Sequence, residues 1–219
     1  MKKFVFTPSA AGGHRRYEKR NKRLLIGVSG KIGSGKTTFC KILERYGFFH
    51  IEADKIVHDL YKKNRAGTKL VQKIFGKKYI TAAGHVNRVL LRDYFVEGHA
   101  KFDFFLKRLY PLVIAEINKK MCGCRRVAIE FIDFDIPHFR KLIDKLIYIE
   151  CPERLILKRY TSKKFPAKYI KAVMNLQKKP KKIDLIVNNN SFKKHLRESA
   201  KMIYCTQVAP PKRGTGPYK

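Results

Sequence analysis

The residues best suited to chemistry lie in one short loop. Residues 30–37 read Gly-Lys-Ile-Gly-Ser-Gly-Lys-Thr, which has the form GxxxxGK[ST] of a phosphate-binding loop. In such a loop, backbone N–H groups and the N-terminus of the next helix surround a polyphosphate. We expect Lys36 to reach the β- and γ-phosphates of ATP and the Thr37 hydroxyl to bind Mg²⁺. The residues expected to hold the nucleotide are Gly30, Gly33, Ser34, Gly35, Lys36, Thr37 and Thr38. The alternative is a glycine-rich turn that only looks like the motif.

The segments around the loop have the pattern needed to position it. The apolar run 24–28 predicts a buried parallel strand, and a helix is expected from the loop to about Tyr46. Four more strands are predicted at 48–51, 127–131, 145–149 and 184–187, with helical stretches between them. Strands that alternate with helices indicate an α/β fold, with a parallel sheet covered on both faces.

The region between the second and third predicted strands is mostly helical. Apolar residues recur at helical spacing from about residue 55 to residue 121. Pro111 lies in the last of these amphipathic stretches, and we expect it to interrupt the helix because proline removes a backbone donor.

Two carboxylates lie at or just after the ends of predicted strands. Ligands of open α/β sheets sit outside the carboxyl ends of the strands, which is where Asp54 is expected. Asp54 could take a proton from an attacking hydroxyl in phosphoryl transfer, or it could cap a helix that begins at Lys55. Glu130, at the end of the third strand, could bind Mg²⁺ through water or be an ordinary strand-end acid. Position alone leaves both choices open.

Composition limits the setting of the protein. The 219 residues suit one α/β domain with an inserted subdomain. Fifty Lys and Arg against 17 Asp and Glu give a formal charge of +33, which favours nucleotides, phosphate-bearing coenzymes, RNA or anionic surfaces as partners, or reflects a basic proteome. Five cysteines without a disulfide framework, no apolar run of membrane-spanning length and no secretory signal favour a cytoplasmic protein. We expect a monomer that binds no membrane, and nucleic-acid binding is not required.

The ends of the chain differ from its centre. Residues 1–22 are strongly basic and are expected to be a disordered arm, and residues 205–219 are expected to be a disordered basic tail. The predicted folded domain therefore spans residues 23–204.

Taken in order, these motifs resemble the dephospho-coenzyme A kinase family. Its glycine-rich loop corresponds to Gly30–Thr38, and its second strand, ending in I-D-A-D before a helix, corresponds to Ile51-Glu52-Ala53-Asp54 and the residues to Tyr61. Further family segments match Ile74-Phe75-Gly76, Gly84 with Asn87-Arg88, Tyr110-Pro111-Leu112-Val113, 142–149 and 184–189. The resemblance covers roughly residues 24–203.

The resemblance implies a reaction and a role for several residues. ATP would phosphorylate the ribose 3′-hydroxyl of dephospho-coenzyme A, with Asp54 as the general base. Arg88 matches a basic residue of the helical acceptor-binding part, here about 55–121. Asn189 matches the segment near the adenine of ATP.

A lid is also implied. Residues 158–182 contain ten Lys and Arg and no acid, as a closing lid over phosphates requires. Arg159 and Lys163 are the candidate catalytic cations, although the family usually has arginine at the second position. The alternative for any single lysine is a solvated basic helix.

The chain also departs from the family pattern. Ala83 replaces an aspartate, Tyr110 replaces a histidine, and Ile132 stands where the family has the proline of D-I-P-L-L. These positions lie on the acceptor side. They leave open a divergent kinase with another acceptor, or a protein that binds ATP or RNA without catalysis.

Overall fold

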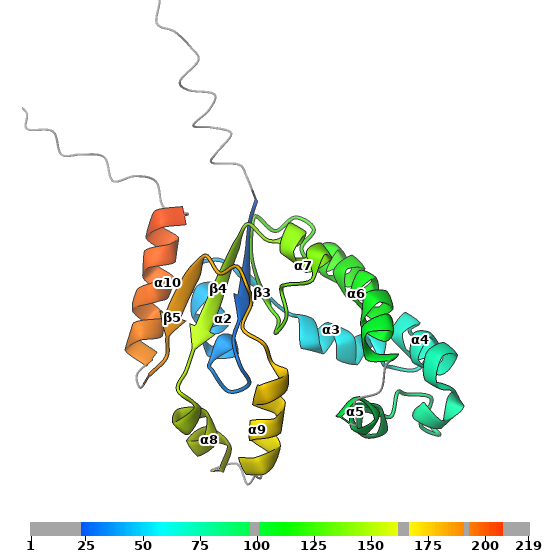
Figure 1. Cartoon of the computed structure of the whole chain (residues 1–219). Coiled ribbons are helices and arrows are strands. Elements are labelled where there is room, and N and C mark those ends of the chain that lie inside the picture. The colour runs from blue at the N-terminus through cyan, green and yellow to red at the C-terminus, as the bar shows by residue number, and fades with distance from the viewer. Residues whose placement is uncertain (1–22, 97–100, 162–166, 191–192, 208–219) are drawn as a thin grey trace, which may run out of the picture.

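The computed structural model describes residues 23–96, 101–161, 167–190 and 193–207. Five parallel strands form one sheet in the order β2-β3-β1-β4-β5, at the centre of Figure 1. The strands are β1 (Leu24–Ser29), β2 (Phe49–Glu52), β3 (Arg126–Glu130), β4 (Lys145–Glu150) and β5 (Leu185–Asn188). The predicted α/β fold with a parallel sheet is thus confirmed. Among the described residues, no helix is long and apolar enough to cross a membrane.

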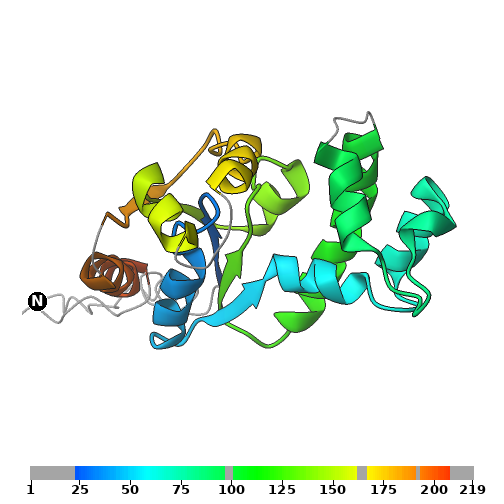
Figure 2. The ribbon, with the colours of Figure 1, turned by 90° about the horizontal axis from the view of Figure 1, so that it is seen from below.

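Nine α-helices and one short 3₁₀ helix are found in the described part of the chain. They are α2 (Lys36–Glu44), α3 (Ala53–Leu60), α4 (Ala66–Phe75), the 3₁₀ helix η1 (Lys77–Tyr79), α5 (Arg88–Val96), α6 (Lys101–Lys120), α7 (Pro137–Leu142), α8 (Glu153–Thr161), α9 (Ala167–Leu176) and α10 (Lys193–Gln207). Helices α3 to α6 form an insertion that extends to one side of the sheet, while α8 and α9 lie beyond the carboxyl end of β4 (Figures 1 and 2).

The two faces of the sheet belong to different hydrophobic clusters. In β1, Leu25 packs with the insertion and α7, whereas Ile26 and Val28 pack with α2 and α10. The same alternation recurs in β3, where Val127 and Ile129 face one cluster and Ala128 the other. Burial on both faces explains why these strands read as continuous apolar runs.

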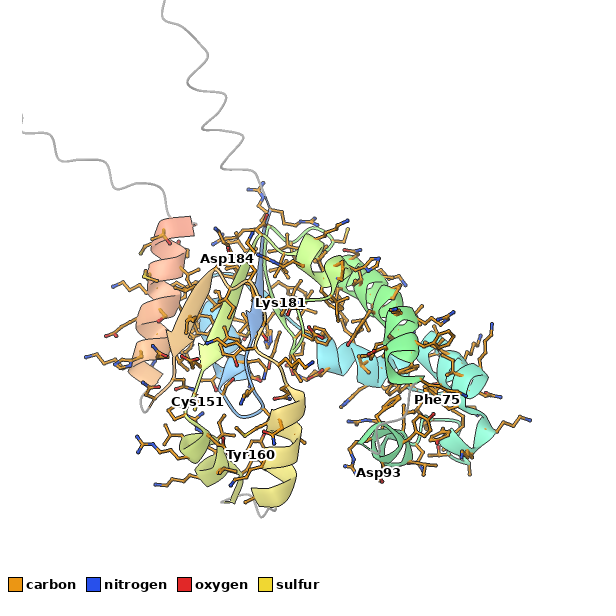
Figure 3. The ribbon with its side chains drawn as sticks, viewed as in Figure 1. Phe75, Asp93, Cys151, Tyr160, Lys181 and Asp184 are labelled. Carbon is orange, nitrogen blue, oxygen red and sulfur yellow. The ribbon has the colours of Figure 1, made fainter. Side chains whose placement is uncertain are left out.

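An aromatic cluster holds the outer helices of the insertion together. The ring of Phe75, labelled in Figure 3, makes edge-on contacts with Tyr79, Tyr94, Phe95 and Phe105, with centroid distances of 5.2 to 5.6 Å. Each such pair contributes about 0.5–1.5 kcal/mol beyond its buried area. These contacts join α4, η1, α5 and α6 at the outer end of the cluster that reaches the sheet, and so position α5, which carries Arg88.

Pro111 does not break its helix, contrary to the sequence-based expectation. Helix α6 is continuous from Lys101 to Lys120 with Pro111 inside it. Proline inside a helix costs roughly 3 kcal/mol. Leu109, Val113 and Ile117 on the same helix are each at most 3% exposed, and a fully buried side chain of this size contributes about 1.5–3 kcal/mol. Burial on this face therefore outweighs the cost of the proline.

The folded region also extends past residue 204, so the expected start of the tail at residue 205 is wrong. Helix α10 ends at Gln207. Ile203 is buried, and the ring of Tyr204 lies 5.2 Å from that of Tyr46 between centroids. These contacts hold the last turns of the helix against α2. The expected arm, residues 1–22, lies outside the described residues, as do residues 208–219 of the expected tail.

Candidate active site

The loop between β1 and α2 has the conformation that its glycines permit. Gly30, Gly33 and Gly35 all have positive φ, which disfavours any residue with a side chain. A Cβ atom at Gly33 would lie 2.6 Å from the ring of Tyr160, and one at Gly35 would lie 2.4 Å from Nδ2 of Asn189. The loop is therefore held in place by α8 and by the segment after β5, and not by its own sequence alone.

The side chain of Lys36 folds back onto the phosphate loop and bonds to its backbone. Its Nζ donates hydrogen bonds to the carbonyl oxygens of Gly30, at 2.8 Å, and Lys31, at 3.1 Å, and the residue is only 8% exposed. Burial lowers the pKa of the Lys36 ammonium, while the charges of Glu130 and Asp54 oppose that change. The ammonium group thus spans the mouth of the loop, where phosphate oxygens would neutralise it.

Thr37 and Glu130 lie together at the adjacent ends of α2 and β3. The Thr37 hydroxyl donates to Oε1 of Glu130 at 2.8 Å, and Nε2 of His50 lies 3.1 Å from Oε2 of the same carboxylate. Burial opposes ionisation of Glu130, but the hydrogen bonds with His50 and Thr37 and the charge of Lys36 outweigh it and hold its pKa below the ordinary value. A hydroxyl beside an ionised carboxylate is a donor set of the oxygen type that Mg²⁺ prefers.

Asp54 lies inside the first turn of α3, because the helix begins at Ala53. The alternative that Asp54 caps a helix starting at Lys55 is therefore wrong; Glu52 occupies the cap position. Asp54 is accessible to solvent at the surface, but the protein around it partly desolvates the carboxyl and raises its pKa; the charge of Lys36 opposes that rise, and the charge of Glu130 adds to it. Asp54 thus belongs to the same electrostatic neighbourhood as the phosphate loop.

Arg88 lies close enough to α3 for its charge to act on His58 of that helix and on Tyr61, which follows it. Desolvation lowers the pKa of His58, the charge of Arg88 lowers it further, and the charge of Asp54 acts in the opposite direction. Arg88 also acts on Tyr61, whose pKa burial raises. His58 follows Asp54 by one helical turn on the same face of α3, and the charges of both Arg88 and Asp54 reach it.

Tyr110, one of the departures noted above, lies on this side as well. Its ring makes edge-on contacts with Phe131 at 5.8 Å and Phe139 at 5.5 Å between centroids. Burial raises the pKa of its hydroxyl, and the charge of Asp133 adds to the rise. The tyrosine is thus anchored in the core that joins the insertion to the sheet.

Asn189 supports the phosphate loop through a hydrogen bond to its backbone. Its side chain is buried, and Nδ2 donates to the Ser34 carbonyl oxygen at 2.7 Å. Its backbone N–H also donates to the Glu150 carbonyl oxygen at 2.7 Å. The family resemblance implies a place near the adenine of ATP for this residue; in the structure its side chain contacts the backbone of the phosphate loop.

Gln177 is a second brace, and sequence analysis gave it no role. Its Oε1 accepts a hydrogen bond from the backbone N–H of Ile32 at 2.7 Å. The residue also lines a cavity of about 580 Å³ beside the loop, together with Lys31, Tyr148, Cys151 and Met174. A volume of this size suits a nucleotide-sized ligand. The two bonded residues are 145 positions apart, so no local pattern could reveal the contact.

Replacing Gln177 by leucine is expected to weaken ATP binding by about tenfold. The substitution leaves the Ile32 N–H without its acceptor, and an unsatisfied donor of this kind costs about 1–3 kcal/mol. Titration calorimetry with ATP measures the effect. Gln72→Leu, which makes the same substitution at an exposed position of α4 away from this cavity, is the matched control. Equal affinities for the two variants would contradict the bracing role.

Arg159 reaches the loop from α8. Its Nη1 donates to the Gly33 carbonyl oxygen at 2.8 Å and lies 3.4 Å from Sγ of Cys151. Figure 3 shows Cys151 just beyond β4 and Tyr160 on α8, on the side that packs with α9. This guanidinium group is therefore held next to the phosphate loop. Lys163, the other predicted lid cation, lies outside the described residues.

Comparison with known proteins adds independent information. A family model described as dephospho-CoA kinase matches residues 24–194. The dephospho-CoA kinase of Carboxydothermus hydrogenoformans is 29% identical over 184 residues, which cover 80% of this chain and 89% of that relative.

Solved structures point the same way. Dephospho-CoA kinase from Campylobacter jejuni has a TM-score of 0.51 and 25% identity, over 84% of this chain and 97% of that one. The crystal structure of TT1252 from Thermus thermophilus has a TM-score of 0.68 over the same shares of the two chains; at 17% identity it shows the fold alone.

Proposed function

The chain belongs to the dephospho-CoA kinase family and is a kinase, and we propose that it transfers the γ-phosphoryl group of ATP to the ribose 3′-hydroxyl of dephospho-coenzyme A. The observation that carries this proposal is the geometry of the phosphate loop, in which the carbonyl oxygens of Gly30 and Lys31 hold Nζ of Lys36 and the Thr37 hydroxyl donates to Glu130. Asp54, the candidate base, follows β2 at the same carboxyl edge of the parallel sheet as this loop.

Asp54 is the proposed general base. Its carboxylate accepts the proton of the acceptor hydroxyl as the oxygen attacks the γ-phosphorus, and ADP leaves. The raised pKa of Asp54 supports this role, because a base works best when its pKa approaches the working pH. Lys36, the loop amides and Arg159 neutralise charge on the phosphates, which is the main source of catalysis in phosphoryl transfer.

Thr37 and Glu130 are the proposed residues for Mg²⁺. The Thr37 hydroxyl oxygen and Oε1 of Glu130 lie 2.8 Å apart, and the carboxylate is ionised. Both are oxygen ligands of the kind that Mg²⁺ prefers, which supports this assignment. Held by these two residues, Mg²⁺ would supply positive charge that neutralises the phosphate oxygens during transfer. In this chain, Thr37 holds Glu130 in place and His50 holds its other oxygen.

The acceptor is proposed to lie between the sheet and the helical insertion. Arg88 supports this because its positive charge suits a phosphate-bearing acceptor and because its charge acts on His58 beside Asp54. Tyr110 packs against Phe131 and Phe139, so the residue at this position joins the insertion to the sheet on the proposed acceptor side.

The acceptor is tested by mass spectrometry of the reaction products. We expect the purified full chain, with ATP and Mg²⁺, to add one phosphoryl group to dephospho-coenzyme A and none to coenzyme A, whose 3′-hydroxyl is already phosphorylated. Nucleoside monophosphates serve as alternative acceptors under the same conditions. Faster turnover of any of these than of dephospho-coenzyme A would contradict the proposed substrate.

A further inference from the structure

A cluster of three metal-ligand side chains lies behind the phosphate loop. Cys40 of α2, His50 of β2 and Glu130 of β3 each offer a ligand atom, and these three atoms lie within 4.8 Å of one another. A thiol, an imidazole and a carboxylate from three different elements are thus brought to one point. Cys40 has no part in the proposed phosphoryl transfer, and His50 enters it only by holding Oε2 of Glu130.

The surroundings of the cluster are those of a built site. Nε2 of His50 lies 3.1 Å from Oε2 of Glu130, and Nδ1 on the other side of the ring lies 3.7 Å from Oε1 of Glu44. A ring nitrogen that faces a second carboxylate is the usual arrangement of a metal-binding histidine, because the outer carboxylate fixes the ring and its tautomer. Glu130 is fixed in the same way, since the Thr37 hydroxyl donates to its other oxygen.

The cluster is also shielded from water. Cys40 is fully buried and the His50 side chain is 4% exposed, whereas the Glu130 side chain is 12% exposed.

From this geometry we propose that Cys40, His50 and Glu130 form a binding site for a divalent transition-metal ion of the Zn²⁺ type. Mixed sulfur, nitrogen and oxygen ligands select Zn²⁺ and its neighbours, while Mg²⁺ and Ca²⁺ take oxygen ligands. Binding releases the thiol proton to solvent, because the thiolate is the ligand. With three protein ligands, the fourth position of a tetrahedral ion is left for water.

The site is connected to the phosphate loop through one residue. Glu130 offers Oε2 to the cluster and Oε1 to Thr37. A metal ion bound at the cluster therefore shares a ligand with the proposed Mg²⁺ site. The competing explanation for the same contacts is an imidazole of His50 that lies between Glu44 and Glu130 with no metal ion bound.

Cobalt titration of the full-length, metal-free protein separates these explanations. Co²⁺ replaces Zn²⁺ in such sites, and a cobalt–thiolate bond gives a charge-transfer absorption band. We expect this band to saturate at one Co²⁺ per chain in the presence of excess Mg²⁺ and to disappear when Zn²⁺ is added. Cys40→Ser and His50→Gln should abolish it, and both keep a polar group in place to preserve the fold.

The double variant Cys122→Ser/Cys124→Ser is the control, because these two thiols lie two positions apart in the sequence and Cys122 is exposed. The band must survive in this variant. A band that persists in Cys40→Ser, that depends on Cys122 and Cys124, or that is absent from the unmutated chain would overturn the proposal. Zinc-edge X-ray absorption of the unmutated chain gives a second answer without substitutions: one sulfur ligand is expected, and none contradicts the site.

Discussion

Lys36→Ala is expected to reduce the rate of phosphoryl transfer by about three orders of magnitude or more, the scale on which a single cation stabilises this transition state. The ammonium group is held by the carbonyl oxygens of Gly30 and Lys31, so it is already in position when the nucleotide binds. Alanine has neither the charge nor the reach to replace it. Single-turnover kinetics with ATP and dephospho-coenzyme A measure the loss of rate.

Two controls make this result specific. Lys41→Ala removes an exposed lysine from the same helix and should leave the rate unchanged. Thermal unfolding of Lys36→Ala must show a folded protein, because the substitution also deprives two carbonyl oxygens of their donor. Binding to an unspecific polyanion such as heparin should survive, since it depends on the overall charge of +33. Full kinase activity in Lys36→Ala would refute the assigned role.

Asp54→Asn is expected to lower turnover by about two to four orders of magnitude while ATP binding persists, as is typical for the loss of a general base. Asparagine preserves the size of the side chain but cannot accept the proton of the acceptor hydroxyl. Calorimetry should therefore give a similar affinity for ATP, and the loss should appear in kcat.

The pH dependence provides a second readout for Asp54. A base must be deprotonated to act, so the rate of the unmutated enzyme should fall as the pH drops through the raised pKa of Asp54. This acid limb should vanish from the residual activity of Asp54→Asn. Asp59→Asn is the matched control, because Asp59 lies on the same helix and pairs with Lys62 at 2.6 Å. An unchanged rate in Asp54→Asn would make Asp54 a merely structural residue of the first turn of α3.

The phosphate loop could be predicted from sequence because its chemistry is local. Eight consecutive residues contain the glycines, the lysine and the hydroxyl, and the apolar run before them identifies the strand. The parallel sheet could be predicted for a similar reason, since strands buried on both faces are apolar throughout and alternate with helices. The family followed from the order of several such segments, and comparison with known proteins confirmed it.

Predictions from local propensity failed where tertiary contacts outweighed it. Pro111 reads as a helix breaker, yet α6 continues because Leu109, Val113 and Ile117 are buried along the same helix. Asp54 could not be assigned from its position, because a strand-end acid and a helix cap look identical in sequence. In the structure α3 begins at Ala53 and Glu52 takes the cap position, so Asp54 does not cap the helix. The charge of Lys36 acts on the Asp54 carboxyl.

By itself, the sequence determined the α/β class, the phosphate loop and the family, because each depends on neighbouring residues or on a repeated period. The tertiary structure alone decided how the site is supported. Gln177 reaches Ile32 across 145 positions, Asn189 reaches Ser34 across 155, and His50 reaches Glu130 across 80. Such contacts depend on where whole strands and helices come to lie, and no local pattern of residues encodes that placement.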